Sequence, residues 1–357
     1  MNNILSPSPI GLGLMSGTSL DGLDMALCQF FYENSRWRYK IISCKTTNYN
    51  EPFRERLKEA DTLDGLGLVE LNRDFAAHIG GQVNALLQEV GVRPDFIASH
   101  GQTVFHQPQR ALTLQIGSGA VIAAVTGIPT VCDFRTTDVA LGGQGAPLVP
   151  IGDQLLFGGY AACLNLGGFC NISFDSGGRR VAFDIAPCNM LLNTLAARLG
   201  RPYDPNGIYA RDGYLVDALT DALNALPYYA QGGAKSLGKE WFDREVVPLL
   251  DREGAMPQDL LRTSVEHIAV QIGRILNVNN IQSVLVTGGG AKNSYLMDRI
   301  RWHAPNTMVV IPDEATVDFK EAIIFAFLGL LRLRGECNCL ADVTGAARDN
   351  IGGAVYL

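Results

Sequence analysis

The sequence predicts an α/β protein built from two domains. The chain has 357 residues, which is more than one typical hydrophobic core organises. Strand-like apolar runs alternate with stretches whose apolar residues recur at helical spacing. In addition, a strand that runs into a glycine-rich tip and out into another strand occurs twice, at tips about 150 residues apart. We therefore expect one such tip in each domain.

The first half of the chain begins with a predicted β-hairpin. Apolar residues 10–12 and 25–28 flank a turn rich in Gly, Ser and Thr, which is typical of a hairpin with an exposed tip. Further strands are predicted at 37–46, 94–98, 112–116 and 128–134, and helices at 51–60, 66–90 and 118–125. Residues 135–150 are rich in Gly and polar groups and are either a linker or an active-site loop.

The second half repeats the opening pattern. A strand at 160–166 leads into the tip Gly167-Gly168 and out into a strand at 172–174. A strand at 181–184 ends on the carboxylate of Asp184. Further strands are predicted at 283–287 and 308–311, and helices at 187–199, 257–278, 293–302 and 319–333. Asn293 is a plausible N-cap for the helix that follows Gly288-Gly289-Gly290.

The first tip, GLMSGTSLDGLD at residues 13–24, offers the groups that a phosphate site needs. Backbone N–H groups and hydroxyls fit phosphate oxygens, and an adjacent carboxylate fits Mg²⁺ directly or through water. It is not a Walker A loop, because no Lys occurs between residues 1 and 39. Taken alone, the segment is equally well explained as an ordinary tight turn.

Composition narrows the functional classes. The net charge of −7, with no basic patch, argues against a nucleic-acid or anionic-membrane partner. No secretory signal pattern and no apolar run of membrane-spanning length is present. The eight scattered Cys are expected to be buried reduced thiols, so we expect a cytoplasmic protein.

Two glycine hairpins followed by a strand–GGGA–helix segment resemble the actin/Hsp70/sugar-kinase superfamily, in which two ribonuclease-H-like domains flank an ATP cleft. Within it, the segments at 13–24, 99–106, 113–117, 133–150, 164–172, 238–242, 287–293 and 343–346 resemble anhydro-N-acetylmuramic acid kinases. These segments run almost from end to end of the chain. The resemblance implies a first domain at 1–135, a second at 136–339, and a C-terminal segment at about 340–357 that packs back on the first.

The resemblance also implies a reaction. The family opens the 1,6-anhydro bond of 1,6-anhydro-N-acetylmuramic acid with water and transfers the ATP γ-phosphate to O6, which recycles cell-wall sugar. The cofactors implied are ATP and Mg²⁺, the partner is a small amino sugar, and a homodimer is expected.

Site residues are carried over from the same resemblance. Asp184 matches the family's catalytic Asp and is expected to be the general base that activates water. The residues expected at ATP and its phosphates are Gly17, Thr18, Ser19, Leu20, Asp21, Gly22, Leu23, Asp24, Gly167, Gly168, Gly288, Gly289 and Gly290. Asp21 and Asp24 are the candidate Mg²⁺ residues, directly or through water. The residues expected at the sugar are Ser99, His100, Gln102, Arg135 and Asn171.

Each of these roles has a structural alternative. Asp184 also fits a helix N-cap or a structural carboxylate, His100 a hydrogen-bonded core imidazole, and Asn171 a turn amide. Arg135 suits the lactyl carboxylate of the substrate, because a planar guanidinium matches a carboxylate.

The chain departs from the family pattern at several positions. After Asp184, the family's Thr, two Gly and an Asp are replaced by Ile185, Ala186, Cys188 and Asn193. Near the C-terminus, a family Met-Glu-Ala-Glu is Lys-Glu-Ala-Ile at 320–323. These changes leave open a related kinase for a different amino sugar, and a chaperone-like or non-catalytic ATP-binding protein.

Overall fold

A computed structural model describes residues 6–17, 20, 22–233, 235–252 and 254–357. Thr18, Ser19 and Asp21 of the predicted phosphate turn lie outside the described residues. The chain forms two compact units, which are considered separately here. Unit 1 comprises Met1–Leu156 and Phe319–Leu357, and unit 2 comprises Phe157–Asp318.

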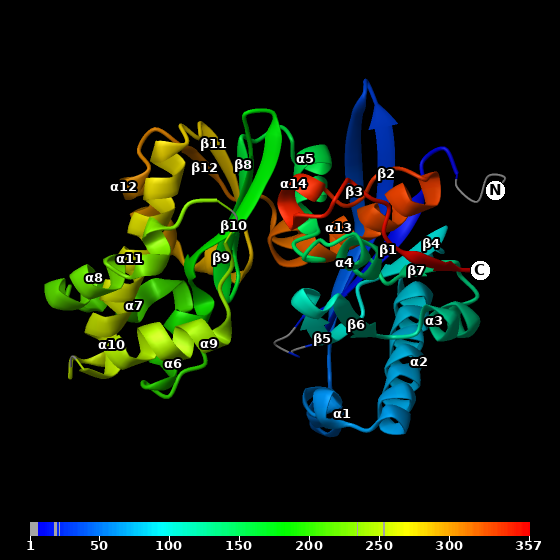
Figure 1. Ribbon diagram of the computed structural model, residues 1–357, viewed down its shortest axis with the longest axis horizontal. Helices are drawn as coiled ribbons and strands as arrows, with labels where there is room; N and C mark the ends of the chain where they lie inside the picture. Colours follow the sequence, from blue (N-terminus) through cyan, green and yellow to red (C-terminus); the bar gives the residue numbers. More distant parts are fainter. Residues whose placement is uncertain (1–5, 18–19, 21, 234, 253) are drawn as a thin grey trace. The chain divides into compact units, whose positions relative to one another are not determined.

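Unit 1 is built on a six-stranded sheet with the order β13-β7-β4-β1-β2-β3 (Figure 1). Its strands are β1 (Ile10–Ser16), β2 (Gly22–Glu33), β3 (Arg36–Asn48), β4 (Phe96–Ser99), β7 (Thr130–Cys132) and β13 (Ala354–Tyr356). Strands β1, β2 and β3 are antiparallel neighbours, while β4 and β7 continue the sheet in parallel. The predicted opening hairpin is therefore present, as β1 and β2.

Helices cover both faces of this sheet. Side chains alternate along a strand, so Leu12 and Leu14 of β1 face one side, where they pack in a cluster with residues of α2 (Gly65–Val90). The opposite side of β1 carries Gly13, where a Cβ would collide with the Ala322 carbonyl of α13 (Glu314–Arg334). A glycine there lets α13 lie directly against the strand backbone.

Unit 2 is built on a five-stranded sheet with the order β10-β9-β8-β11-β12. Its strands are β8 (Ala162–Leu166), β9 (Phe169–Ser176), β10 (Arg179–Pro187), β11 (Ser283–Thr287) and β12 (Met308–Val310). Strands β8, β9 and β10 are antiparallel neighbours, and β11 and β12 continue in parallel. In both units, three sequential antiparallel strands are extended by parallel strands, as in a ribonuclease-H-like domain. The predicted α/β fold class is confirmed.

Long helices complete the core of unit 2. The helix α11 (Pro257–Val278) has the predicted bounds and buries one side in the same apolar cluster as β8 and β9. The helix α12 (Ser294–His303) begins after Asn293, whose side chain accepts the Leu296 N–H as the predicted N-cap.

Shorter elements fill the connections. They are α1 (Glu51–Lys58), η1 (Ala60–Thr62), β5 (Gln102–Gln107), η2 (Pro108–Arg110), β6 (Leu112–Ile116), α3 (Gly119–Thr126), α4 (Thr136–Ala140), α5 (Val149–Leu156), α6 (Asn189–Ala197), η3 (Pro205–Gly207), α7 (Ile208–Asp212), α8 (Asp217–Asn224), η4 (Pro227–Ala230), α9 (Lys239–Trp241), η5 (Phe242–Val246), α10 (Val247–Arg252), η6 (Gly289–Lys292) and α14 (Ala341–Thr344). Within the described part of the chain, no helix is both long and apolar enough to cross a membrane.

The boundaries of the compact units differ from the domain boundaries expected from the sequence. The expected boundaries were 135/136 and 339/340, whereas the units divide at 156/157 and 318/319. Residues 136–156 therefore pack within unit 1 through α4 and α5 and are not a linker. The second division falls inside α13, which starts five residues earlier than the predicted 319.

Candidate active site

Asp184 lies on β10, the edge strand of the unit 2 sheet. The register with β9 shifts between Asp184 and Ala186, so the strand carries a bulge directly after the carboxylate. Bulges of this kind redirect a side chain at functional sites. The Asp184 Oδ2 accepts the Leu237 N–H at 2.8 Å, and no described residue bonds to Oδ1. One carboxylate oxygen is thus oriented by the protein and the other is available.

Burial sets the protonation behaviour of Asp184. Its pKa is raised above the ordinary range because the carboxyl is largely removed from water, and the Leu237 N–H partly offsets this rise. Asn171 on β9 is the cross-strand partner of Asp184 and is half-buried. Its side chain makes no hydrogen bond to a described residue, so its amide faces the same region without a protein partner.

The second glycine tip is anchored to the start of α6. The Gly168 carbonyl accepts the N–H of Cys188 at 2.8 Å, and the Gly167 carbonyl accepts the N–H of Asn189 at 3.0 Å. The Asn189 side chain also donates to the Leu166 carbonyl at 2.9 Å. These bonds fix the tip relative to the end of β10, which continues to Pro187, three residues beyond the end at Asp184 that the sequence predicted.

The third glycine segment packs against the same tip. Gly288 has φ of +83°, and a Cβ there would lie 2.5 Å from the Asn165 Oδ1, so only glycine fits without strain. The segment borders a cavity of about 420 Å³ within unit 2. The cavity is lined by Asn189, Leu192, Asn193, Tyr203, Asp204, Pro205, Asn206, Gly289, Gly290, Lys292 and Asn293.

The charged groups of this cavity are already engaged. Lys292 forms an ion pair with Asp318 at 2.7 Å. The Asp204 carboxylate accepts the backbone N–H groups of Tyr209 and Ala210 at 3.0 and 2.9 Å. The rest of the lining consists of the amides of Asn193 and Asn206, the engaged amides of Asn189 and Asn293, the apolar Leu192 and Pro205, two glycines, and Tyr203, which is 59% exposed. Such a lining suits a flat, uncharged heterocycle.

In unit 1, a buried network of hydroxyl groups holds the end of β1, directly before Gly17 of the first glycine turn. Ser16 donates to the Gln102 Oε1 at 2.7 Å and accepts from the Tyr49 hydroxyl at 2.8 Å. The Leu20 N–H bonds to the Gly17 carbonyl at 3.2 Å. Gln102 is therefore a support of the turn, and its carbonyl oxygen is used by the protein.

Arg135 and His100 form a second polar group in unit 1. Arg135 donates to the His100 Nε2 from Nε at 3.2 Å and from Nη2 at 2.8 Å, and Nη1 donates to the Gly145 carbonyl at 2.6 Å. The His100 Nδ1 contacts the Gly101 carbonyl at 2.8 Å. Both ring nitrogens of His100 are engaged, and Arg135 has no ion pair with any described carboxylate.

Ser99 and Glu321 are two further polar residues of unit 1 whose side chains have no described hydrogen-bond partner. The Ser99 hydroxyl is buried and has no hydrogen-bond partner among the described residues. Glu321 on α13 is half-buried and has no described hydrogen bond or ion pair. Burial raises its pKa, Asp24 raises it further, and Lys320 and Arg135 oppose the rise. The Asp24 Oδ1 accepts the Thr46 hydroxyl at 2.6 Å.

Sequence reasoning missed several of these residues. Tyr203 and Asn206 carry no motif, and only the fold brings them to the cavity beside Gly289 and Gly290. Lys292 lies in the segment 287–293 but was not among the predicted site residues. Glu321 belongs to the segment 320–323, where the sequence indicated only replaced residues and not a part of the site. In unit 2, the fold brings together Asp184 with Asn171, and Leu166, at the base of the second glycine tip, with Gly288 and Gly290. In unit 1, it brings together His100 with Arg135, and Ser16 with Gln102.

Comparison with known proteins agrees with these observations. The sequence profile of the family described as "Anhydro-N-acetylmuramic acid kinase" matches residues 10–357. The anhydro-N-acetylmuramic acid kinase of Pseudomonas putida is 38% identical and that of Aliivibrio fischeri 35% identical, each covering 97% of this chain and 98% of the relative.

Among solved structures, the activator of the 2-hydroxyisocaproyl-CoA dehydratase from Clostridium difficile with bound ADPNP is 12% identical. It covers 91% of this chain and 97% of its own, with a TM-score of 0.44. The full-length family match and the close relatives decide the assignment: this chain belongs to the anhydro-N-acetylmuramic acid kinase family.

Proposed function

We propose that this chain is an ATP-dependent kinase that opens 1,6-anhydro-N-acetylmuramic acid with water and phosphorylates it at O6. The single observation that carries the chemistry is the half-buried Asp184 carboxylate. Its Oδ2 is oriented by the Leu237 N–H, and its Oδ1 has no described partner. A carboxylate held in this way can orient a water molecule and accept its proton.

The proposed reaction couples opening of the anhydro ring by water to transfer of the γ-phosphoryl group. Asp184 accepts a proton from water while the water oxygen forms a bond to C1 of the sugar and the C1–O6 bond breaks. O6 then forms a bond to the γ-phosphorus of ATP, and the bond from that phosphorus to the bridging oxygen of ADP breaks. The products are N-acetylmuramic acid 6-phosphate and ADP, and Asp184 releases the proton it accepted to solvent. Burial raises the pKa of Asp184 and so makes it a stronger base than an exposed aspartate.

Arg135 is proposed to bind the lactyl carboxylate of the sugar. Its guanidinium has no ion pair with a described carboxylate, although burial disfavours an unpaired charge. Glu321 acts on Arg135 electrostatically but forms no ion pair with it, and an incoming carboxylate would supply a direct partner in a planar, bidentate geometry. Because both ring nitrogens of His100 are already engaged, we assign His100 to positioning Arg135 and not to direct substrate contact.

The cavity of unit 2 is proposed to hold the nucleoside of ATP. Its amide-rich lining and the exposed ring of Tyr203 fit a purine and a ribose. The glycine tip at Gly167 and Gly168 of unit 2 is proposed as a phosphate-binding segment, and so are the described residues of the segment Gly17 to Asp24 of unit 1. Backbone N–H groups at such tips bind phosphate without a side chain in the way.

The residues in unit 1 fit a magnesium ion. Asp24 and Glu321 are carboxylates that influence each other electrostatically, and Glu321 has no described partner. Magnesium prefers oxygen ligands and usually takes one or two carboxylates together with phosphates and water. When bound, the ion would neutralise charge on the transferring phosphate. We propose that the carboxylates of Asp24 and Glu321 hold the magnesium ion. Asp21, the other candidate from the sequence, lies outside the described residues.

The altered residues after Asp184 do not favour a different amino sugar. Ile185, Ala186 and Cys188 are all buried in the apolar cluster of unit 2, so they pack in the core. Asn193 is exposed and borders the cavity assigned to the nucleoside. The replacements thus concern packing and nucleotide contact, which supports the family's own substrate. A cytoplasmic homodimer is likewise proposed from the resemblance.

The direct test is an assay of the purified chain with Mg-ATP and 1,6-anhydro-N-acetylmuramic acid in ¹⁸O-water. We expect mass spectrometry to find the 6-phosphate with one ¹⁸O atom at C1, and Asp184→Asn to abolish product. Phosphorylation of another amino sugar in preference to this one would overturn the substrate assignment. A well-folded wild-type chain that releases no product from any amino sugar would overturn the enzyme assignment.

A further inference from the structure

One segment of unit 2 makes hydrogen bonds to both the backbone and the side chain of Asp184 on β10. We call residues 227–237 the strap; all of them are described except residue 234. The Asp184 N–H donates to the Lys235 carbonyl at 3.0 Å, and the Tyr228 hydroxyl donates to the Asp184 carbonyl at 2.7 Å. The Leu237 N–H donates to the Asp184 Oδ2 at 2.8 Å. Backbone and side chain of the proposed base are therefore held by one segment.

Tyr228 is the buried anchor of the strap. Its side chain is almost fully buried, and its ring packs against Trp241 and Tyr229 with centroids 5.3 and 5.7 Å away. Burial raises the pKa of the Tyr228 hydroxyl well above its ordinary value, so the group remains a hydrogen-bond donor throughout the working pH range.

Lys235 closes the strap on itself. Its Nζ donates to the carbonyls of Tyr228 and Gln231, both at 3.1 Å, and lies 4.4 Å from the centroid of the Tyr228 ring. Lys235 has no ion pair with a described carboxylate. A lysine that satisfies backbone carbonyls and stacks on the anchoring ring is placed to hold the conformation of the strap.

We propose that Tyr228 and Lys235 are positioning residues for the general base, acting through the strap to fix where the Asp184 carboxylate points. This inference rests on the proposed role of Asp184. The bulge after Asp184 breaks the regular ladder with β9, so the strand alone does not fix the carboxylate. The strap supplies the missing restraint from the other side.

The strap also affects the charge state of Asp184. The Leu237 N–H lowers the pKa of Asp184, against the rise caused by burial. The other titratable groups nearby are the Cys170 thiol of β9, the Tyr228 hydroxyl and the Lys235 ammonium, with Arg274 of α11 acting on Lys235. Burial raises the pKa of the Cys170 thiol and of the Tyr228 hydroxyl, which keeps both neutral. Loosening the strap weakens the Leu237 bond and should raise the pKa of Asp184 further.

The test variant is Tyr228→Phe, which removes only the hydroxyl. We expect kcat to fall about 5- to 20-fold with little change in the KM for ATP, as for a base that is present but less well oriented. The acidic limb of the kcat/KM profile should move up by about half a pH unit. Lys235→Gln should shift the same limb in the same direction.

The matched control is Tyr229→Phe. Tyr229 is the neighbouring buried tyrosine, and its hydroxyl bonds to the His267 Nε2 at 2.8 Å rather than to Asp184. This variant should lose stability without moving the acidic limb. Equal behaviour of the two tyrosine variants, with the limb unmoved in both, would overturn the inference.

A second measurement does not depend on activity. With ¹³C-carboxyl-labelled aspartate and the Asp184→Asn variant for assignment, the Asp184 carboxyl can be titrated by NMR. We expect its pKa to be higher in Tyr228→Phe than in the wild type, and an unchanged pKa overturns the inference. An inactive wild type with this shift present would instead overturn the proposed function alone.

Discussion

Arg135 donates to the Nε2 of His100 from both Nε and Nη2, at 3.2 and 2.8 Å. Nε2 must therefore be the unprotonated nitrogen, and Nδ1 carries the proton that is donated to the Gly101 carbonyl. Burial, together with the nearby guanidinium, lowers the pKa of His100 to about 3, so the ring is neutral at working pH. The pair consists of a cation and a neutral acceptor, and the positive charge of Arg135 remains available to an anion.

The first prediction follows for Arg135→Lys. A lysine keeps the charge but loses the planar fork, so kcat/KM for 1,6-anhydro-N-acetylmuramic acid should fall by about 10- to 100-fold. Steady-state kinetics at fixed Mg-ATP measure this. The control substrate is 1,6-anhydro-N-acetylglucosamine, which lacks the lactyl carboxylate. If kcat/KM of the variant falls as much for the control sugar as for the substrate, Arg135 does not bind the lactyl carboxylate.

The second prediction concerns His267 and the pH dependence of stability. His267 is buried between the Tyr229 hydroxyl and the Asn224 Oδ1, and burial lowers its pKa to about 3. Between pH 6.5 and 3 the unfolded chain binds a proton at this residue and the native chain does not. Stability must therefore fall as the pH is lowered through this window, by up to about 1.4 kcal/mol per pH unit.

The measurement compares thermal unfolding of the wild type and His267→Gln between pH 7.5 and 5. The glutamine lacks a titrating group, so the variant should lose less stability than the wild type over this interval, whatever its stability at pH 7.5. Parallel pH profiles for the two proteins would show that His267 is protonated in the native state as readily as in the unfolded chain.

Local pattern was enough to predict much of the fold. Apolar periodicity set the bounds of α11 and β11, and the Asn293 cap set the start of α12, because these signals lie within a few residues of one another. The strand β5 was missed because Gln102, Thr103 and His106 give it a polar character. The second division between the compact units falls inside the continuous helix α13, where composition does not change, so the sequence carries no local signal for it.

The partners of the site residues could not be predicted from the sequence. The bond between Arg135 and His100 joins residues 35 positions apart, and that between Leu237 and Asp184 joins residues 53 apart. The buried carboxylate of Asp138 likewise accepts from Thr344 and Asn350, more than 200 residues away. Such pairs depend on tertiary packing, for which one sequence carries no local signal.

The third prediction concerns the cavity of unit 2, which is proposed to hold the nucleoside of ATP. Tyr203→Ala should raise the KM for ATP about 5- to 50-fold with little change in kcat, because stacking acts on the bound ground state and the transition state alike. Tyr203→Phe should keep the affinity, since the face of the ring is what stacks.

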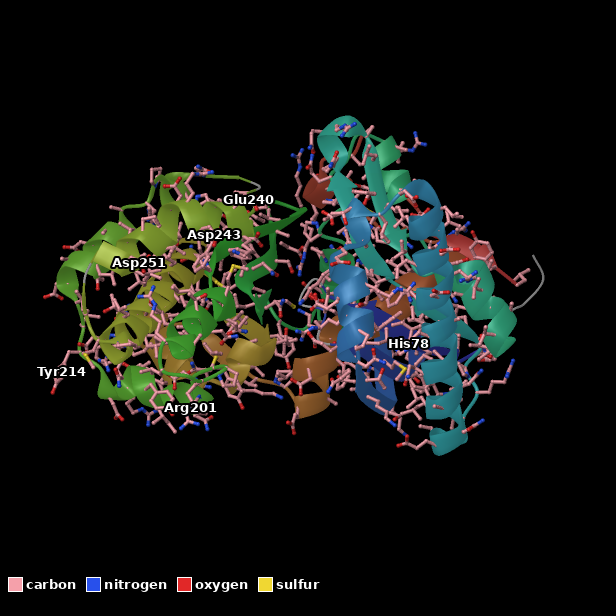
Figure 2. The ribbon with its side chains drawn as sticks, turned by 90° about the horizontal axis from the view of Figure 1, so that it is seen from below. His78, Arg201, Tyr214, Glu240, Asp243 and Asp251 are labelled. Carbon is pink, nitrogen blue, oxygen red and sulfur yellow. The ribbon has the colours of Figure 1, made fainter. Side chains whose placement is uncertain are left out.

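The control for Tyr203 is Tyr214→Ala. Tyr214 is 81% exposed, and its side chain points away from the body of unit 2 into solvent, as Figure 2 shows. It does not line the cavity. This variant should have wild-type kinetics. An increase in the KM for ATP of the same size in both alanine variants would remove Tyr203 from the nucleotide site.

The last prediction concerns the buried ion pair of unit 1. Lys320 on α13 and Asp153 on α5 lie 2.7 Å apart, and both side chains are only 5% exposed. Lys320→Met removes the cation and leaves a buried carboxylate without its counter-charge, which should lower the free energy of unfolding by about 3–5 kcal/mol. Asp153→Asn should also lower the free energy of unfolding, because it leaves the buried Lys320 ammonium without the carboxylate of Asp153.

The double variant Lys320→Met/Asp153→Asn separates the pair from its two members. Removing both charges leaves neither member of the pair buried without the other, so the double variant should be more stable than Lys320→Met alone. Denaturant unfolding of the four proteins in the cycle measures the coupling. Additive losses would mean that each charge is stabilised by its surroundings independently of the other. A positive coupling would instead show that the lysine at 320 depends on the aspartate at 153, so that α5 and α13 are joined by charge as well as by apolar packing.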